Sequence, residues 1–147
     1  MFDNVLTICS AVTLDSCLGY VSDYCSTRYE WKVEDADMAR DEEDDRAWNM
    51  ECADAYLQVR TIISNALVFI DGCYQLSGAV RCSLLLQVLS QVARSKNHAG
   101  IESGKWAAFN SVCEPLSDLF LAYLKNDADM ARWFNLKNGL DPDMRWG

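Results

Sequence analysis

One stretch near the middle of the chain constrains the fold more than any other feature. Between Ala47 and Ile70, apolar residues recur at steps of three, four or their sums, which is the periodicity of a helix with one buried face. Because such a helix must bury its apolar face against other elements, the pattern predicts a packed helical domain. The apolar positions are Met50, Ala53, Leu57, Ile63, Leu67 and Ile70.

Residues that favour turns are scarce in this sequence. Only two prolines and seven glycines interrupt 147 residues, whereas an all-β domain of this size needs many more turn residues. Half of the residues are hydrophobic, so the chain is too apolar to be disordered despite a net charge of −9. We therefore predict an all-α fold, a compact bundle of about five helices in a single domain spanning residues 1–147.

Three further stretches have helical periodicity. Residues 79–93 are apolar on nearly all sides and predict a central, buried helix. A first helix is expected from Asp3 to about Tyr24. Another is expected to begin after a Ser103 cap and to meet a kink or a new start at Pro115, because proline removes a backbone donor.

The hexapeptide DADMAR occurs twice, and a shortened form, DPDMR, occurs near the end of the chain. The copies start at Asp35, Asp127 and Asp141. Asp is a strong N-cap and proline suits the first helical position, so all three copies predict helix starts. A duplicated binding motif is the alternative. An EF-hand calcium loop is disfavoured, because both full copies lack the third ligand and the glycine turn.

Acidic residues are concentrated in one segment. Residues 30–54 carry eleven of the 22 acidic side chains and three of the 13 basic ones, so this segment holds −8 of the net charge of −9. If the segment is helical from Asp35 onward, its carboxylates recur about every 5 Å along one stripe, a spacing of the same order as the 3.4 Å per phosphate of a nucleic-acid strand. The stripe would contain Glu34, Asp37, Asp41, Asp44, Trp48 and Glu51. A surface of this kind fits a basic groove built for DNA or RNA. The alternative is a solvated acidic face or loop.

Motifs for catalysis, metals and cofactors are not found in the sequence. The lone histidine, His98, lies in a polar turn-like stretch, and there is no Walker loop, GxGxxG, GxSxG or HExxH motif. The seven cysteines include no closely spaced pair, which argues against a zinc site and favours reduced core thiols. We predict a protein that is not an enzyme and has no catalytic residues, cofactor or metal.

The sequence also bears on surroundings and partners. No secretory signal or membrane span is visible, so we expect a cytoplasmic protein. Direct binding to nucleic acid is disfavoured, because a chain with an isoelectric point near 4.4 is repelled by phosphates. Trp133, Phe134 and Trp146 lie close together in a polar stretch, where exposed aromatic residues commonly anchor interfaces. The alternative for these three is that the C-terminal tail folds back and buries them.

Two functions remain after these exclusions. The first is an acidic inhibitor that blocks a basic, nucleic-acid-binding site on a partner protein; its composition is similar to that of phage anti-defence inhibitors, including anti-CRISPR proteins, and of immunity proteins. The second is a non-catalytic helical structural or adaptor subunit that self-assembles through apolar helix faces, which leaves a homo-oligomer possible. The expected partner-binding residues are Glu34, Asp37, Asp41, Glu42, Glu43, Asp44, Asp45, Trp48, Glu51, Trp133, Phe134 and Trp146.

Overall fold

The computed structural model describes residues 14–39, 41–73 and 76–147, and this part of the chain contains five helices and no strand. The all-α prediction is confirmed, and so is the expected number of helices. The helices are α2 (Leu14–Met38), α3 (Glu43–Asp71), α4 (Gly78–His98), α5 (Gly104–Asn126) and α6 (Ala128–Lys137).

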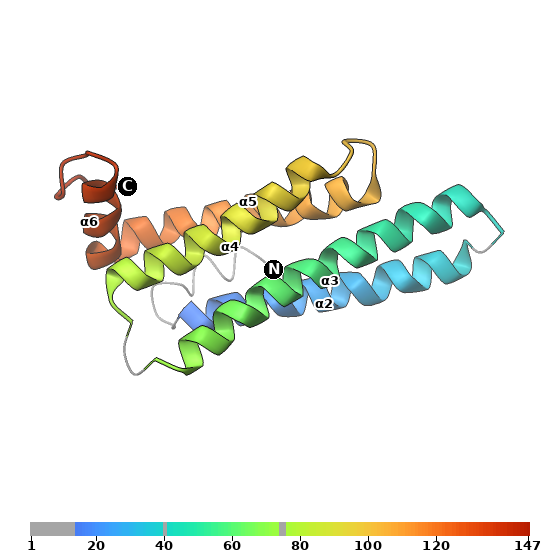
Figure 1. The fold of residues 1–147 in the computed structure, drawn as a ribbon, viewed down its shortest axis with the longest axis horizontal. Helices are drawn as coiled ribbons and strands as arrows, with labels where there is room; N and C mark the ends of the chain where they lie inside the picture. Colours follow the sequence, from blue (N-terminus) through green and yellow to red (C-terminus); the bar gives the residue numbers. More distant parts are fainter. Residues whose placement is uncertain (1–13, 40, 74–75) are drawn as a thin grey trace.

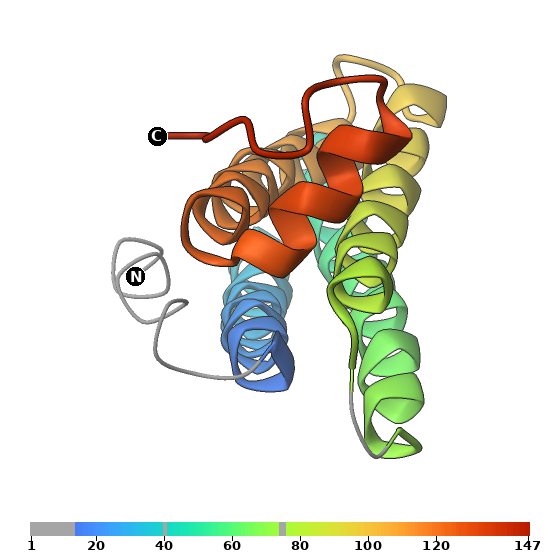
Figure 2. The same ribbon diagram turned by 90° about the vertical axis from the view of Figure 1, so that its left-hand side faces the viewer.

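The helices form two long hairpins that lie against each other. The α2–α3 hairpin and the α4–α5 hairpin form the body of the molecule, and α6 crosses one end of the second hairpin (Figures 1 and 2). At the opposite end, α2 and α3 extend beyond the turn that joins α4 to α5 (Figure 1). The bundle therefore has one end closed by α6 and another at which the first hairpin protrudes.

The buried face of α3 differs from the face expected from the sequence. Its buried residues recur at alternating steps of four and three, the spacing of a seam between long packed helices. Met50 and Leu57, expected in the core, are 40% and 41% exposed, while Ala53 and Ile63 are buried as expected. The seam consists of Cys52, Tyr56, Val59, Ile63 and Ala66.

Helix α5 supplies more of the core than α4 does. Along α5, buried apolar residues continue from its first turn to its last, and the helix packs against α3, α4 and α6. The apolar helix expected at 79–93 is present as α4, which buries Leu85, Val88 and Val92, although Leu86 and Leu89 are only partly buried. The buried residues of α5 are Gly104, Ala108, Phe109, Val112, Leu116, Leu119, Phe120, Tyr123 and Leu124.

One expected helix boundary is wrong, and of the two alternatives at Pro115 the new helix start is not found. The polar, acidic stretch after Tyr24 does not end the first helix, because α2 continues to Met38; the expected helical residues 3–13 lie outside the described residues. Pro115 lies inside α5 and starts no new helix. The apolar contacts of Val112, Leu116 and Leu119 on both sides of Pro115 hold the helix in the core despite the missing donor.

Only one of the three DADMAR-related copies starts a helix. Asp127 has an extended backbone, and its side chain accepts a hydrogen bond from the Met130 amide, so it caps α6 as predicted. Asp35 instead lies inside α2, one turn before its end. Asp141 forms a turn in which its carboxylate accepts from the Asp143 amide, and no helix follows. The prediction was wrong for Asp35 and Asp141. An Asp caps a helix only where the helix begins at the next residue, and no helix begins directly after either of these two.

The second DADMAR copy also joins α6 to α4. Asp127 forms a two-bond ion pair with Arg81, at 2.8 and 3.0 Å, and Asp129 accepts a 2.7 Å hydrogen bond from the Gly78 amide at the first turn of α4. A side chain at Gly78 would collide with Asp129, which explains the glycine. The motif therefore connects the N-terminal ends of α4 and α6.

Candidate protein-binding surface

The protruding end of the α2–α3 hairpin is the candidate binding surface. Helix α5 begins at Gly104, which packs directly on the Trp48 carbonyl and on Cys52, whose thiol donates to the Gly104 carbonyl at 3.3 Å. The part of α3 before Trp48 therefore lies beyond the start of α5, as Figure 1 shows. We call residues 31–39 and 41–50 the hairpin end.

The hairpin end turns sharply where the acidic residues are densest. Helix α2 ends at Met38 and α3 begins at Glu43, with Glu42 in an extended conformation at the N-cap position. The first turn of α3 is acidic, and carboxylates there lie near the positive end of the helix dipole. The charge of these residues thus also favours the start of α3.

The single carboxylate stripe does not form. It required one helix through residues 35–54, but the two helices run in opposite directions on either side of the turn, so the acidic residues surround the end of a hairpin. Trp48 is 39% exposed, and Glu51 is half-buried. The remaining acidic candidates are all exposed: Glu34, Asp37, Asp41, Glu42, Glu43, Asp44 and Asp45.

Arg81 forms ion pairs with Asp127 and Asp129, and Arg132 forms one with Asp143, all of them away from the hairpin end. At the hairpin end, a hydrogen bond with Asp45 and its negative charge raise the pKa of Glu42 above its usual range. The raised pKa reflects the crowding of like charges. The hairpin end therefore presents closely spaced, exposed carboxylates.

Large apolar side chains accompany the acidic residues. Trp31 is 52% exposed, Met38 86% and Met50 40%. The Lys32 ammonium lies 4.8 Å from the centre of the Trp48 ring, which links α2 to α3 through a cation–π contact. The sequence prediction included Trp48 but missed Trp31 and Met38. Both are large apolar residues within a charged, polar stretch of sequence, and this position could have indicated that they are exposed.

The expected C-terminal aromatic residues lie at the opposite end of the molecule and pack against the core. Phe134 makes edge contacts with Phe120 at 5.3 Å and with Trp146 at 5.6 Å between ring centres. The Trp146 indole donates to buried Asn135 at 2.8 Å, and Lys137 covers the Trp133 ring at 4.8 Å. All three aromatic residues are partly buried, and the tail folds back so that Trp146 packs against Phe134. The structure therefore does not bring them together with the acidic candidates.

Other groups with reactive side chains are dispersed. His98 is exposed at the last residue of α4. Burial raises the pKa of the Cys25 thiol to about 12 and that of the Cys82 thiol to about 11, so both are neutral packing groups near pH 7. The described residues include no group of three or more potential ligands placed to hold a metal ion. No helix in this part of the chain is both long and apolar enough to span a bilayer.

Comparison with known proteins finds no relative for this chain. No protein-family model matches the sequence, and neither the curated proteins nor the solved structures include a match.

Proposed function

We propose that the protein binds a partner protein through the hairpin end and blocks a basic surface on it. The observation that carries this proposal is that exposed carboxylates surround the protruding turn between α2 and α3, beyond the body of the bundle. A protruding element can enter a groove that a flat acidic face cannot reach. A groove that binds nucleic acid is basic and accepts closely spaced negative charges, so it is the partner site that fits best.

The exposed apolar residues would form the centre of this interface. Tryptophan and other large side chains contribute most of the binding energy in protein interfaces, while charges at the rim mainly accelerate association. Trp31, Met38 and Trp48 would provide the apolar contacts, and the surrounding carboxylates would provide attraction and orientation. In this role the protein is an inhibitor of the phage anti-defence or immunity-protein kind, acting without catalysis.

The test is a change of charge at the hairpin end with a matched control. A pull-down at low salt first identifies the bound partner, and its association rate is then measured for a variant with Asp41, Glu43 and Asp44 replaced by Lys. The control replaces the exposed acids Asp23, Glu114 and Asp118 by Lys, which changes the net charge equally.

We expect the hairpin variant to associate at least about tenfold more slowly at low salt, and the control much less so, because attraction depends on where charge is placed. Nucleic acid should compete for the same site on the partner. Equal rates for the two variants would contradict the proposal.

The second candidate function is a structural or adaptor subunit that self-assembles. Exposed Val68 and Phe69 on α3, 72% and 51% accessible, favour it. Salt separates the two functions, because binding through carboxylates weakens with ionic strength, whereas apolar self-association does not.

A further inference from the structure

Charged side chains are nearly absent from the adjoining parts of α3 and α4. Residues 55–70 and 82–93 together contain one charged residue, Arg60, whereas 24% of the whole chain is charged. Burial raises the pKa of the Cys25 thiol in α2, and the positive charge of Arg60 opposes this rise, so Arg60 lies on the side of α3 near α2. A helix face in contact with water usually carries charges. The outer surface of these two segments therefore differs from the rest of the protein.

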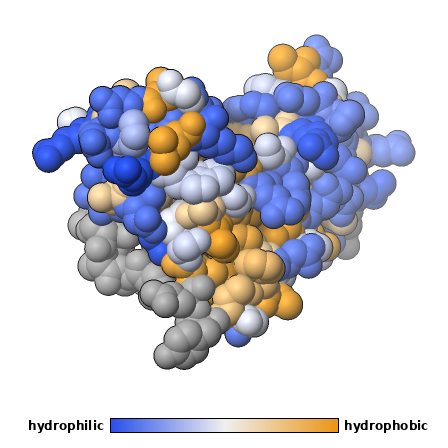
Figure 3. Space-filling view, turned by 60° about the vertical axis from the view of Figure 1, so that its left-hand side comes forward, coloured by the Kyte–Doolittle hydropathy of each residue, from blue (hydrophilic) through white to orange (hydrophobic). Residues whose placement is uncertain are grey.

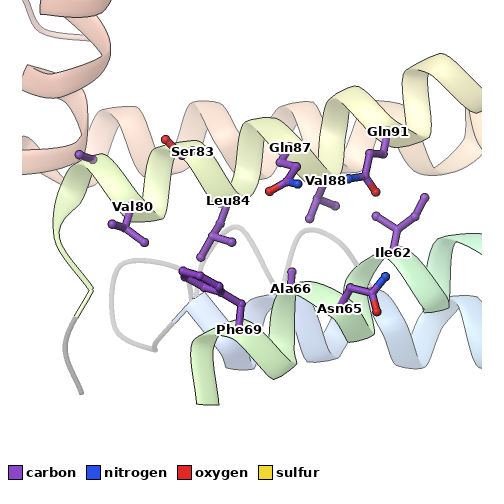
Figure 4. A pocket seen from close by; sticks show the side chains of 11 residues that line it. Ile62, Asn65, Ala66, Phe69, Val80, Ser83, Leu84, Gln87, Val88 and Gln91 are labelled. Carbon is purple, nitrogen blue, oxygen red and sulfur yellow. The ribbon is translucent and has the colours of Figure 1, made fainter. Parts of the chain in front are cut away.

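A groove of about 420 Å³ separates α3 from α4 within this surface. Phe69 of α3 and Leu84 of α4 face each other across it, and Ile62 lies further along (Figure 4). The amide side chains of Asn65 and Gln87 also line the groove. Its lining is thus apolar with neutral polar groups, and it includes no carboxylate.

A ridge of exposed apolar side chains lies beside the groove. Val68 and Phe69 are 72% and 51% exposed, and Leu57, three turns earlier on α3, is 41% exposed. Hydrophobic side chains gather in the lower middle of the space-filling view, with hydrophilic side chains above them and to their right (Figure 3). The surface therefore combines a protruding ridge with a hollow.

We propose that this surface binds a second copy of the chain. We call it the neutral face, formed by Leu57, Gln58, Thr61, Asn65, Val68 and Phe69 of α3 and by Val80, Ser83, Leu84, Gln87 and Gln91 of α4. In a two-fold dimer the same patch meets itself, so it must contain both a protrusion and a recess, and the neutral face has both.

Electrostatics favours a second copy as the occupant. Two chains of net charge −9 repel each other, so they can approach closely only where carboxylates are absent. Interface centres are typically depleted in charged residues, as this face is. The inference does not depend on the proposed role of the hairpin end, which lies on a different part of α3.

The size of the neutral face sets the expected strength. From Leu57 to Phe69, α3 extends about 18 Å, given a rise of about 1.5 Å per residue. The residues of the face are fewer than the roughly 20–30 per side of a standard stable interface. We therefore expect a dimer that dissociates in the micromolar range, on the order of 10 to 100 μM.

Sedimentation velocity on the full chain tests the proposal, over a concentration series at low and high salt. We expect the mass to rise toward that of a dimer with concentration, and the dimer fraction to increase with salt, because salt screens the repulsion between acidic copies. Phe69→Glu, and separately Ser83→Glu at an exposed polar position, should each weaken dimerisation at least tenfold.

The control is Ile101→Glu, which places the same charge on a side chain that is 73% exposed and outside the neutral face. This variant should dimerise like the native chain, and circular dichroism melting should show that all variants are folded. Monomers at every concentration and salt would overturn the proposal. So would a dimer that both neutral-face substitutions leave intact, because another surface would then form it.

Discussion

At the scale of single residues, one hexapeptide has two different structural roles. Asp127 caps α6 and pairs with Arg81, and both side chains are about four-fifths buried. Asp35 is exposed near the C-terminal end of α2, where a negative charge is unfavourable to the helix dipole. Replacing the first Asp of the hexapeptide is therefore expected to change the free energy of unfolding differently in the two copies.

We expect Asp127→Ala to lower the free energy of unfolding by about 1 to 3 kcal/mol, because it removes the cap and leaves Arg81 without its carboxylate partner. Asp127→Asn should cost less, since Asn also caps. Asp35→Ala should be neutral or slightly stabilising, within about 0.5 kcal/mol. Urea unfolding measures all three, and similar losses at Asp35 and Asp127 would contradict the assigned roles.

The sequence predicted the Asp127 and Ser103 caps correctly but could not distinguish Asp35 from Asp127. Capping chemistry depends on the side chain and on an extended backbone at the cap, and the hexapeptide specifies only the first. At Asp127 the chain has just left α5, whereas at Asp35 the preceding residues continue a long helix whose apolar side is held by α3. Tertiary packing therefore decided between them.

At the scale of helices, the periodicity located α3 and α4 but assigned part of the α3 face incorrectly. The seam of α3 uses Cys52, Tyr56 and Ala66, which are small or carry a polar tip. More strongly apolar Leu57 lies on the outside. Hydrophobicity alone favours Leu57, whereas the alternating steps of four and three along the seam select Tyr56 and Val59, on either side of Leu57 in the sequence. The candidate surface was predictable as a charge cluster, but its shape was not, because it depends on where α2 ends.

Two leucines of α4 test the observed burial. Leu85 is 2% exposed, and Leu89 is only partly buried at the edge of the core. We expect Leu85→Ala to cost about 2 to 5 kcal/mol, because it leaves a cavity, and Leu89→Ala to cost about 1 to 2 kcal/mol. Denaturant unfolding gives both values. A larger loss at Leu89 would show that the face of α4 toward the core is rotated from the one described.

At the scale of the whole molecule, charge and apolar surface are separated. Acidic residues gather at the protruding end of the first hairpin, and a surface almost without charge covers the adjoining parts of α3 and α4. Repulsion among the carboxylates of the hairpin end opposes both a compact fold and self-association through that end. The arrangement is consistent with two binding surfaces that respond to salt in opposite directions.

The acidic end should make the stability of the monomer depend on salt. Neighbouring like charges on helices destabilise by about 0.2 to 0.5 kcal/mol per pair, and salt screens them, so the melting temperature should rise between low salt and about 0.5 M salt. Glu34→Gln, Asp37→Asn and Asp41→Asn together should reduce that rise by about 2 to 4 °C, which corresponds to roughly 1 kcal/mol for a domain of this size, because these acids lie at the C-terminal end of α2 or in the turn, where the helix dipole does not favour them. The control neutralises Asp23, Glu114 and Asp118, which gives the same change of net charge away from the hairpin end. The melting temperatures of both variants are measured at low protein concentration, where copies do not associate. An equal effect of the two variants would mean that the net charge matters but that the clustering of charge at the hairpin end does not.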